Sequence, residues 1–288
     1  MRAPTFARGH PPPPDGPPRP NSGRDRRVSG SPGLFFRDKQ GAARHAAAMF
    51  RLELYDDQAR LTLDRPAARN AIPAAGWAEL AGAIGQVAAS GARLLVVTGA
   101  GGTFCAGADL ADFPAMQKDP AATARFRMEM RAALEALRDL PMPTIALIEG
   151  HCYGAGVALA MACDLRIAAP ASSFAITPAK LGISYPQEDV HRLVELAGPG
   201  QAARILFSAA PVDGGEARAI GLVDALLPDA PGLIDAILAN DGASLAMLKR
   251  AIRRAAGGVR SDAEMDAGFD ALIGGEEMAR RLEALRRK

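Results

Sequence analysis

The sequence predicts an α/β fold for most of its 288 residues. Short apolar runs such as 92–99 and 144–150 are typical of buried strands. Segments with helical periodicity, such as 73–89 and 121–140, alternate with these runs. Strands that alternate with helices favour a largely parallel sheet covered by helices. We therefore expect one α/β core with a helical tail.

Three regions are predicted along the chain. Residues 1–48 hold nine Lys/Arg against three Asp, a PPPP run and no hydrophobic periodicity, so we expect a disordered leader. This leader could be a targeting peptide, a basic tail for nucleic acid or, as we favour, an upstream extension that takes no part in the chemistry. Residues 49–240 are predicted to form the core and 241–288 a C-terminal helical region.

The elements of the core follow from residue spacing. Apolar and polar residues alternate on both sides of Asp56 and Asp57, which predicts a β-hairpin. Further strands are expected at 92–99, 144–150 and 164–170, and an irregular segment at 174–186. Helices are expected at 73–89, 121–140, 155–163, 190–196, 199–207, 213–220, 233–239, 244–256 and 262–287.

Composition narrows the class of protein. A hydrophobic content of 49% and a charged content of 23% are ordinary for a soluble protein. Outside the leader 25 basic residues face 29 acidic ones, so we expect no nucleic-acid partner. The three cysteines lack CxxC spacing, which predicts no metal site and a reducing, cytoplasmic setting. No apolar run approaches the roughly 20 residues of a membrane span.

Two glycine-rich turns each follow a predicted buried strand: VTGAGGTFCAGAD at 97–109 and IEGHCYGAG at 148–156. Neither matches the GxGxxG pattern of dinucleotide sites, and the P-loop, HExxH and GxSxG motifs are absent from the sequence. Together the turns could direct backbone N–H groups to one point, as in an oxyanion hole.

Several blocks in register carry a family resemblance: TLDRPAARNAI, VVTGAGGTFCAGADL, PTIALIEGHCYGAGVALAMACDLRIAA, FAITPAKLG and AIGLVDALLP. On these motifs the chain resembles the crotonase (enoyl-CoA hydratase/isomerase) superfamily from about Leu52 to Pro228. The resemblance implies a spiral of ββα units and a homotrimer or dimer of trimers built through the helical tail. It also implies an acyl-CoA substrate, with coenzyme A as part of that substrate and no separate cofactor.

The resemblance also implies site residues. The thioester oxygen would accept hydrogen bonds from the N–H groups of Ala108 and Ala155. Asp109 has a second interpretation, as a cap that orders its loop, and Arg69 could instead be a solvated charge. The residues expected around the CoA moiety are Arg69, Ala71, Ala106, Ala108, Asp109, Leu110, Tyr153 and Gly154.

The chain departs from the hydratase pattern at two positions. Where hydratases of the family carry glutamates, this sequence matches Ala158 and Pro178. Adding water needs a base for the water and an acid for the α-carbon, and neither side chain can serve. Decarboxylation of a malonyl-type thioester needs no such base, because loss of CO₂ itself generates the enolate.

The block FAITPAKLGISY resembles methylmalonyl-CoA decarboxylases of the superfamily, which places Tyr185 in the site as a donor that orients the carboxylate. A half-buried structural tyrosine is the alternative. Glu188 or Asp189 could restore a base for an isomerase or hydratase-like reaction, or could simply be acids in the first turn of a helix. A non-catalytic acyl-CoA-binding protein is a third possibility.

Overall fold

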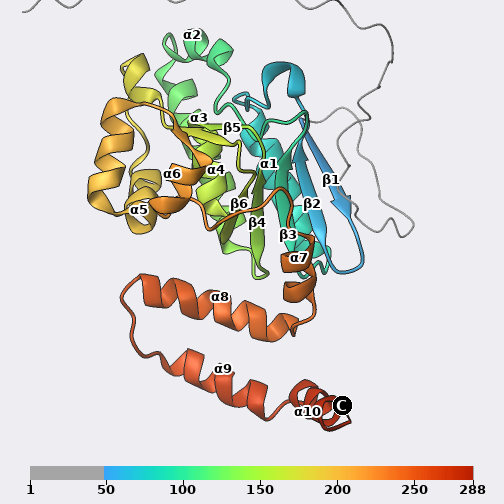
Figure 1. The fold of residues 1–288 in the computed structure, drawn as a ribbon. Helices are drawn as coiled ribbons and strands as arrows, with labels where there is room; N and C mark the ends of the chain where they lie inside the picture. Colours follow the sequence, from blue (N-terminus) through green and yellow to red (C-terminus); the bar gives the residue numbers. More distant parts are fainter. Residues whose placement is uncertain (1–48, 288) are drawn as a thin grey trace, which may run out of the picture. The chain divides into compact units, whose positions relative to one another are not determined.

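Within residues 49–287, which the computed structural model describes, the chain alternates between two β-sheets (Figure 1). The predicted leader, residues 1–48, lies outside this range. The larger sheet has the order β1-β2-β3-β4-β6-β9, and the smaller one has the order β5-β7-β8. The strands are β1 Phe50–Leu54, β2 Ala59–Leu63, β3 Leu95–Gly99, β4 Thr144–Ile148, β5 His151–Tyr153, β6 Leu165–Ala168, β7 Ser173–Ala175, β8 Val212–Asp213 and β9 Ala225–Leu226.

Strand pairing confirms the predicted hairpin and the parallel sheet. β1 and β2 are antiparallel, whereas β2, β3, β4, β6 and β9 pair in parallel. The chain leaves the larger sheet at β4, adds β5 to the smaller sheet, and returns to the larger sheet at β6. It repeats this path with β7, β8 and β9. The result is the expected spiral of strands and helices.

Helices fill the connections between strands (Figure 1). Three short 3₁₀ segments are η1 Pro66–Ala68, η2 Leu110–Asp112 and η3 Pro178–Leu181. The α-helices are α1 Gly76–Ala89, α2 Phe113–Met116, α3 Pro120–Asp139, α4 Ala155–Ala162, α5 Gln187–Ser208, α6 Gly214–Ala219, α7 Pro231–Leu238, α8 Gly242–Ala256, α9 Ala263–Ile273 and α10 Glu276–Arg286.

Two local predictions need correction. The segment 174–186 is not wholly irregular, since it contains the end of β7 and all of η3. The two helices expected at 190–196 and 199–207 are both present in α5, on either side of a kink at Gly198, whose φ is 75°. The single helix expected at 262–287 is divided into α9 and α10, because Gly274 and Gly275 interrupt it.

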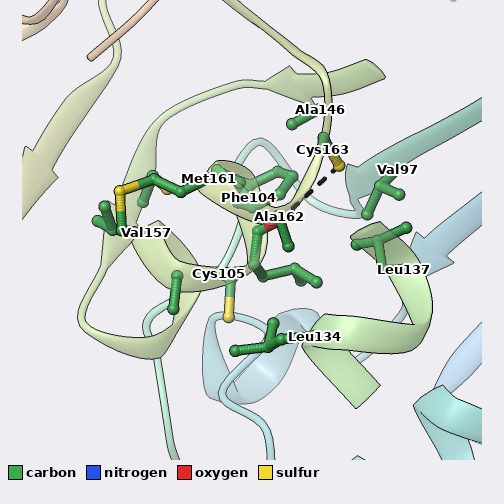
Figure 2. Close-up of a cluster of buried hydrophobic side chains, with 14 of the residues drawn as sticks. Val97, Phe104, Cys105, Leu134, Leu137, Ala146, Val157, Met161, Ala162 and Cys163 are labelled. Atoms are coloured by element: carbon green, nitrogen blue, oxygen red, sulfur yellow. Dashed lines mark hydrogen bonds between the residues drawn. The ribbon is translucent and has the colours of Figure 1, made fainter. Parts of the chain in front are cut away.

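Helix α4 lies in the centre of the core (Figure 2). All of its residues except Ala155 are buried, as expected for a helix that is apolar on every side. Figure 2 shows Val157, Met161 and Ala162 of α4 among buried side chains of other elements. These include Leu134 and Leu137 of α3. The packing fixes α4, and therefore its first turn, relative to the rest of the core.

A buried ion pair attaches α8 to the end of the larger sheet. The Lys249 ammonium lies 2.6 Å from the Asp164 carboxylate and donates a hydrogen bond of 2.8 Å to the Met142 carbonyl. The same carboxylate accepts from the N–H and hydroxyl of Thr144 at the start of β4.

Among the helices of residues 49–287, none combines the length and the apolar character that a membrane span requires.

Candidate active site

The two glycine turns meet at the first turn of α4. A Cβ atom placed on Gly107 would lie 2.9 Å from the Tyr153 carbonyl oxygen and 3.2 Å from the Ala155 nitrogen. One placed on Gly156 would lie 2.6 Å from the Cys105 carbonyl oxygen. Glycine is therefore required on both sides, because any side chain would separate the two backbones. This contact confirms that the turns converge.

Backbone hydrogen bonds hold the turns together. The Cys105 N–H donates to the His151 carbonyl at 3.0 Å, and the Tyr153 N–H donates to the Cys105 carbonyl at 2.8 Å. Ile72 joins the same arrangement, since its N–H donates to the Gly107 carbonyl and its carbonyl accepts from Asp109. The backbone around position 108 is thus fixed from two directions.

The N–H groups of Ala108 and Ala155 have no hydrogen-bond acceptor among residues 49–287. Both residues are half-buried. Ala155 is the first residue of α4, where a helix has no internal acceptor for the N–H and carries positive potential. Two free donors on adjoining turns, one of them at a helix start, suit an oxygen atom that gains negative charge.

A clamp orders the loop that carries Ala108. The Arg65 guanidinium lies 2.5 Å from the Asp109 carboxylate and donates to the Ala71 carbonyl at 3.1 Å. Asp109 also accepts from the Ala111 N–H, so it caps η2 as the capping interpretation expected. These hydrogen bonds, with the Arg65 guanidinium first, lower the pKa of the Asp109 carboxyl. Leu110, the next residue, is 53% exposed.

Asn70 is a structural residue of the site that the sequence interpretation missed. It is fully buried, and its amide donates to the carbonyls of Ala100 and Thr103 while its side-chain oxygen accepts from the Arg65 N–H. Its φ of 57° is one that asparagine tolerates better than most residues. The tolerance of asparagine for this conformation is the feature of the sequence that could have indicated its role. Exposed Arg69 shares this left-handed conformation, with φ 52°, and its carbonyl accepts from Ala106.

The positions that match the two glutamates of hydratases lie in different surroundings. Ala158 is fully buried in α4 and belongs to the central apolar cluster. Pro178 is half-buried and begins η3. Lys180, on the same segment, is exposed.

Tyr185 lies against the first turn of α4. Its ring packs on the apolar core, and its hydroxyl donates a hydrogen bond of 3.0 Å to the Gly154 carbonyl. Burial raises the pKa of this hydroxyl well above its ordinary value, and the charge of Asp189 adds to the rise. The nearby backbone N–H of Ala158 partly opposes this rise in pKa. Tyr185 is therefore a protonated donor directed at the backbone beside Ala155.

Glu188 and Asp189 both stand in the first turn of α5, as the structural interpretation expected. The Glu188 carboxylate pairs with Arg131 of α3. The Asp189 carboxylate is almost fully buried and lies 3.1 Å from Arg192, which also pairs with Glu135. Each acid is thus held by an arginine. The burial of Arg192 was not predicted, because neighbouring α3 supplies its second partner.

Burial raises the pKa of Asp189 to about 6, although Arg192 acts in the opposite direction. Burial likewise raises the pKa of Cys105 and of Cys163 to about 12, and that of Cys152 well above its ordinary value. The cysteines are thus thiols rather than nucleophilic thiolates near neutral pH. Exposed His191 pairs with Glu195 on the same helix.

Comparison with known proteins agrees with this geometry. The family model described as enoyl-CoA hydratase/isomerase matches residues 55–267. The chain belongs to this family. It is 35% identical to YngF of Bacillus subtilis over 207 residues, which cover 69% of this chain and 79% of YngF.

Two further relatives define how far the likeness extends. Human mitochondrial methylglutaconyl-CoA hydratase is 38% identical over 126 residues, 44% of this chain and 37% of that protein. The crystal structure of an enoyl-CoA hydratase from Thermoplasma volcanium matches with a TM-score of 0.77 at 30% identity. That match covers 83% of this chain and 97% of that one. This chain therefore shares the fold of nearly the whole Thermoplasma protein.

Replacing Gly107 by alanine should disrupt the contact between the turns. Gly107 has φ 102°, and its new methyl group would press on Tyr153 and Ala155. Gly91→Ala is the matched control, because Gly91 also has positive φ, 76°, but nothing lies within 4 Å of its added Cβ. We expect Gly91→Ala to lower the free energy of unfolding by about 1–2 kcal/mol. Gly107→Ala should lower it more, as measured by urea denaturation; equal losses would contradict the contact.

Asp189 should make stability depend on pH. Because its pKa is raised from 3.8 to about 6, the folded chain binds this proton more readily than the unfolded chain. The free energy of unfolding should therefore contain a contribution that is complete below pH 4 and is lost as pH rises through 6. Asp189→Asn should remove that slope in urea denaturation, whereas Asp56→Asn, in the exposed hairpin turn, should keep it. An unchanged slope in Asp189→Asn would refute this assignment.

Proposed function

We propose that this member of the enoyl-CoA hydratase/isomerase family decarboxylates a short malonyl-type acyl-CoA. The observation that carries the proposal is a pair of free backbone donors, Ala108 and Ala155, beside a helix whose position 158 is a buried alanine. Such a site stabilises an enolate but offers no acid or base at that position. The names of its relatives indicate hydratases, so the reaction class is the point to be tested.

The proposed reaction balances without a protein base. The bond between the α-carbon and the carboxylate breaks and releases CO₂. Its electron pair moves to the thioester, which becomes an enolate whose oxygen accepts from the N–H groups of Ala108 and Ala155. The α-carbon then takes a proton from water, and the hydroxide that remains combines with CO₂ as bicarbonate. The positive end of α4 favours the charge that develops on the oxygen.

The CoA moiety is assigned to the two loops around Ala108. The Arg65–Asp109 pair and the hydrogen bonds of Asn70 hold these loops in place, which supports this role. Exposed Arg69 is available to a phosphate, and Leu110 presents an apolar side chain. The remaining residues assigned to CoA contact are Ala71, Ala106, Tyr153 and Gly154.

Glu188 receives less support as an alternative base. Its carboxylate is paired with Arg131, and a role in proton transfer would require it to leave that partner. Asp189 is likewise paired with Arg192 and belongs to a buried network between α3 and α5. A donor role of Tyr185 toward the substrate carboxylate would require its hydroxyl to leave the Gly154 carbonyl.

The free, buried cysteines support the cytoplasmic setting inferred from the sequence.

The reaction is tested with methylmalonyl-CoA, ethylmalonyl-CoA and crotonyl-CoA on the same preparation. We expect CO₂ release and loss of the substrate carboxylate with the malonyl thioesters, and no addition of water to crotonyl-CoA. The last expectation follows from Ala158 and Pro178. CO₂ release no faster than without protein, or hydration of crotonyl-CoA, would reject the proposed reaction. Binding of all three without turnover would instead favour a non-catalytic acyl-CoA-binding protein.

We further propose a homotrimer or dimer of trimers built through the C-terminal helices. A groove of about 400 Å³ lies among α8, α9 and α10 with a mainly apolar lining, which supports occupation by a second copy. The side chains involved include Met247, Leu248, Phe269, Leu272, Ile273, Met278, Leu282 and Leu285.

Analytical ultracentrifugation tests the assembly. We expect the mass of three or six chains for the full-length protein, and smaller species for Phe269→Asp, because Phe269 is 62% exposed in this groove. Phe207→Asp is the control, since Phe207 is 83% exposed on α5 outside the groove. A monomeric wild-type protein would contradict the assembly.

A further inference from the structure

One peptide group connects Tyr185 to the proposed oxyanion hole. The carbonyl of Gly154 and the N–H of Ala155 belong to the same planar unit. The carbonyl accepts the hydrogen bond from the Tyr185 hydroxyl at 3.0 Å. The N–H, on the opposite edge of that unit, is one of the two free donors. A contact that fixes the Gly154 carbonyl therefore also fixes the direction in which the Ala155 N–H points.

The orientation of this peptide needs support from outside. Gly154 has φ 51° and ψ −119°, a conformation available to glycine and strained for other residues. Glycine also has other conformations open to it, so its backbone alone does not fix the peptide. The carbonyl accepts from the N–H of Val157 at 3.0 Å and from the N–H of Ala158 at 3.4 Å. The bond from Ala158, which is the regular helical one, is therefore long and weak.

The Tyr185 hydroxyl adds a stronger hydrogen bond to the same carbonyl. It donates to the Gly154 oxygen at 3.0 Å, whereas the Ala158 N–H lies 3.4 Å from that oxygen. A hydrogen bond to a peptide oxygen also polarises the peptide, which makes its N–H a stronger donor. The hydrogen bond from Tyr185 therefore both orients the Gly154–Ala155 peptide and strengthens its N–H as a donor. Both effects favour binding of an oxygen atom by the Ala155 N–H.

We propose that Tyr185 is a positioning residue of the oxyanion hole, which acts on the substrate through the Gly154–Ala155 peptide. The proposal rests on the donor role of Ala155 in the proposed function. It gives Tyr185 a task that needs no contact with a substrate carboxylate. Tyr185 should therefore matter for any acyl-CoA that develops an enolate in this site, whether or not CO₂ leaves.

The surroundings of Tyr185 suit this task. Pro186 directly follows it and restricts the conformation of the backbone. The next turn, at the start of α5, is anchored by the buried Arg192, which pairs with buried Asp189 and with half-buried Glu135. This network belongs to α3 and α5 and lies outside the glycine turns. It can fix the tyrosine without contacting the substrate.

Acetoacetyl-CoA gives a readout that is independent of decarboxylation. It has no carboxylate to lose, and its enolate absorbs in the near ultraviolet, so titration of the complex gives the pKa of the bound ligand. We expect the wild-type protein to lower this pKa relative to the free thioester. Tyr185→Phe should reduce the acid ionisation constant of the bound ligand about 2- to 10-fold, less than the roughly 100-fold effect of losing a whole oxyanion donor. With malonyl thioesters, kcat should fall by a similar factor while KM changes little.

Two further forms of the protein are measured in the same way as controls for Tyr185→Phe. Tyr55→Phe removes the same hydroxyl from the hairpin between β1 and β2 and should leave the pKa of the bound ligand unchanged. Incorporation of 3-fluorotyrosine at position 185 keeps the ring and makes the hydroxyl a stronger donor. It should restore the wild-type pKa of the bound ligand or lower it further, and it tests the proposal even if Tyr185→Phe folds poorly.

The outcomes separate this inference from the proposed reaction. An unchanged pKa of bound acetoacetyl-CoA in Tyr185→Phe would overturn the positioning role. If that variant also lost CO₂ release, the hydroxyl would act on the carboxylate itself. A wild-type protein that releases no CO₂, yet shows a pKa that responds to Tyr185, would reject decarboxylation and support the positioning role.

Discussion

The close approach of two backbones, at Gly107 and at the start of α4, is the constraint on which the candidate site depends. No side chain fits between Gly107 and the Tyr153–Ala155 segment, and none fits between Gly156 and Cys105. Glycine at these points lets N–H groups from separate loops lie side by side. The free donors at Ala108 and Ala155 are a direct consequence. Helix α4 then serves two purposes, because its body fills the core and its first residue supplies a donor.

Charged and amide side chains hold the elements on either side of this site. Arg65, Asp109 and Asn70 fix the loop on one side, and Asp189, Arg192 and Glu135 fix α5 on the other. Ala158 belongs to the apolar core, and the ring of Tyr185 packs against that core. Such an arrangement stabilises charge with fixed dipoles of the backbone. The arrangement suits a reaction that depends on stabilising an anion. It is less suited to a reaction that depends on proton transfer by side chains.

Tyr185 illustrates how a motif can be located correctly while its contact is not predicted. The block LGISYP placed a tyrosine beside the glycine turn. Its hydroxyl, however, is directed to the Gly154 carbonyl, a backbone atom that residue types do not reveal. Asp189 was expected as a first-turn acid and stands there, yet α3 covers it so fully that burial controls its pKa.

The sequence by itself determined the α/β class, the hairpin, the main strands and helices, and the two glycine turns. These follow from local periodicity and from glycine at fixed spacing, which neighbouring residues encode. Only the tertiary structure decided that the turns touch, that Asn70 connects the first of them to Arg65, and that Arg131 and Arg192 hold the two acids of α5. Short strands such as β5 and β7 also required it, because each is stabilised by its partner more than by its own sequence. Contacts between residues far apart in the chain depend on packing, and packing has no local signature.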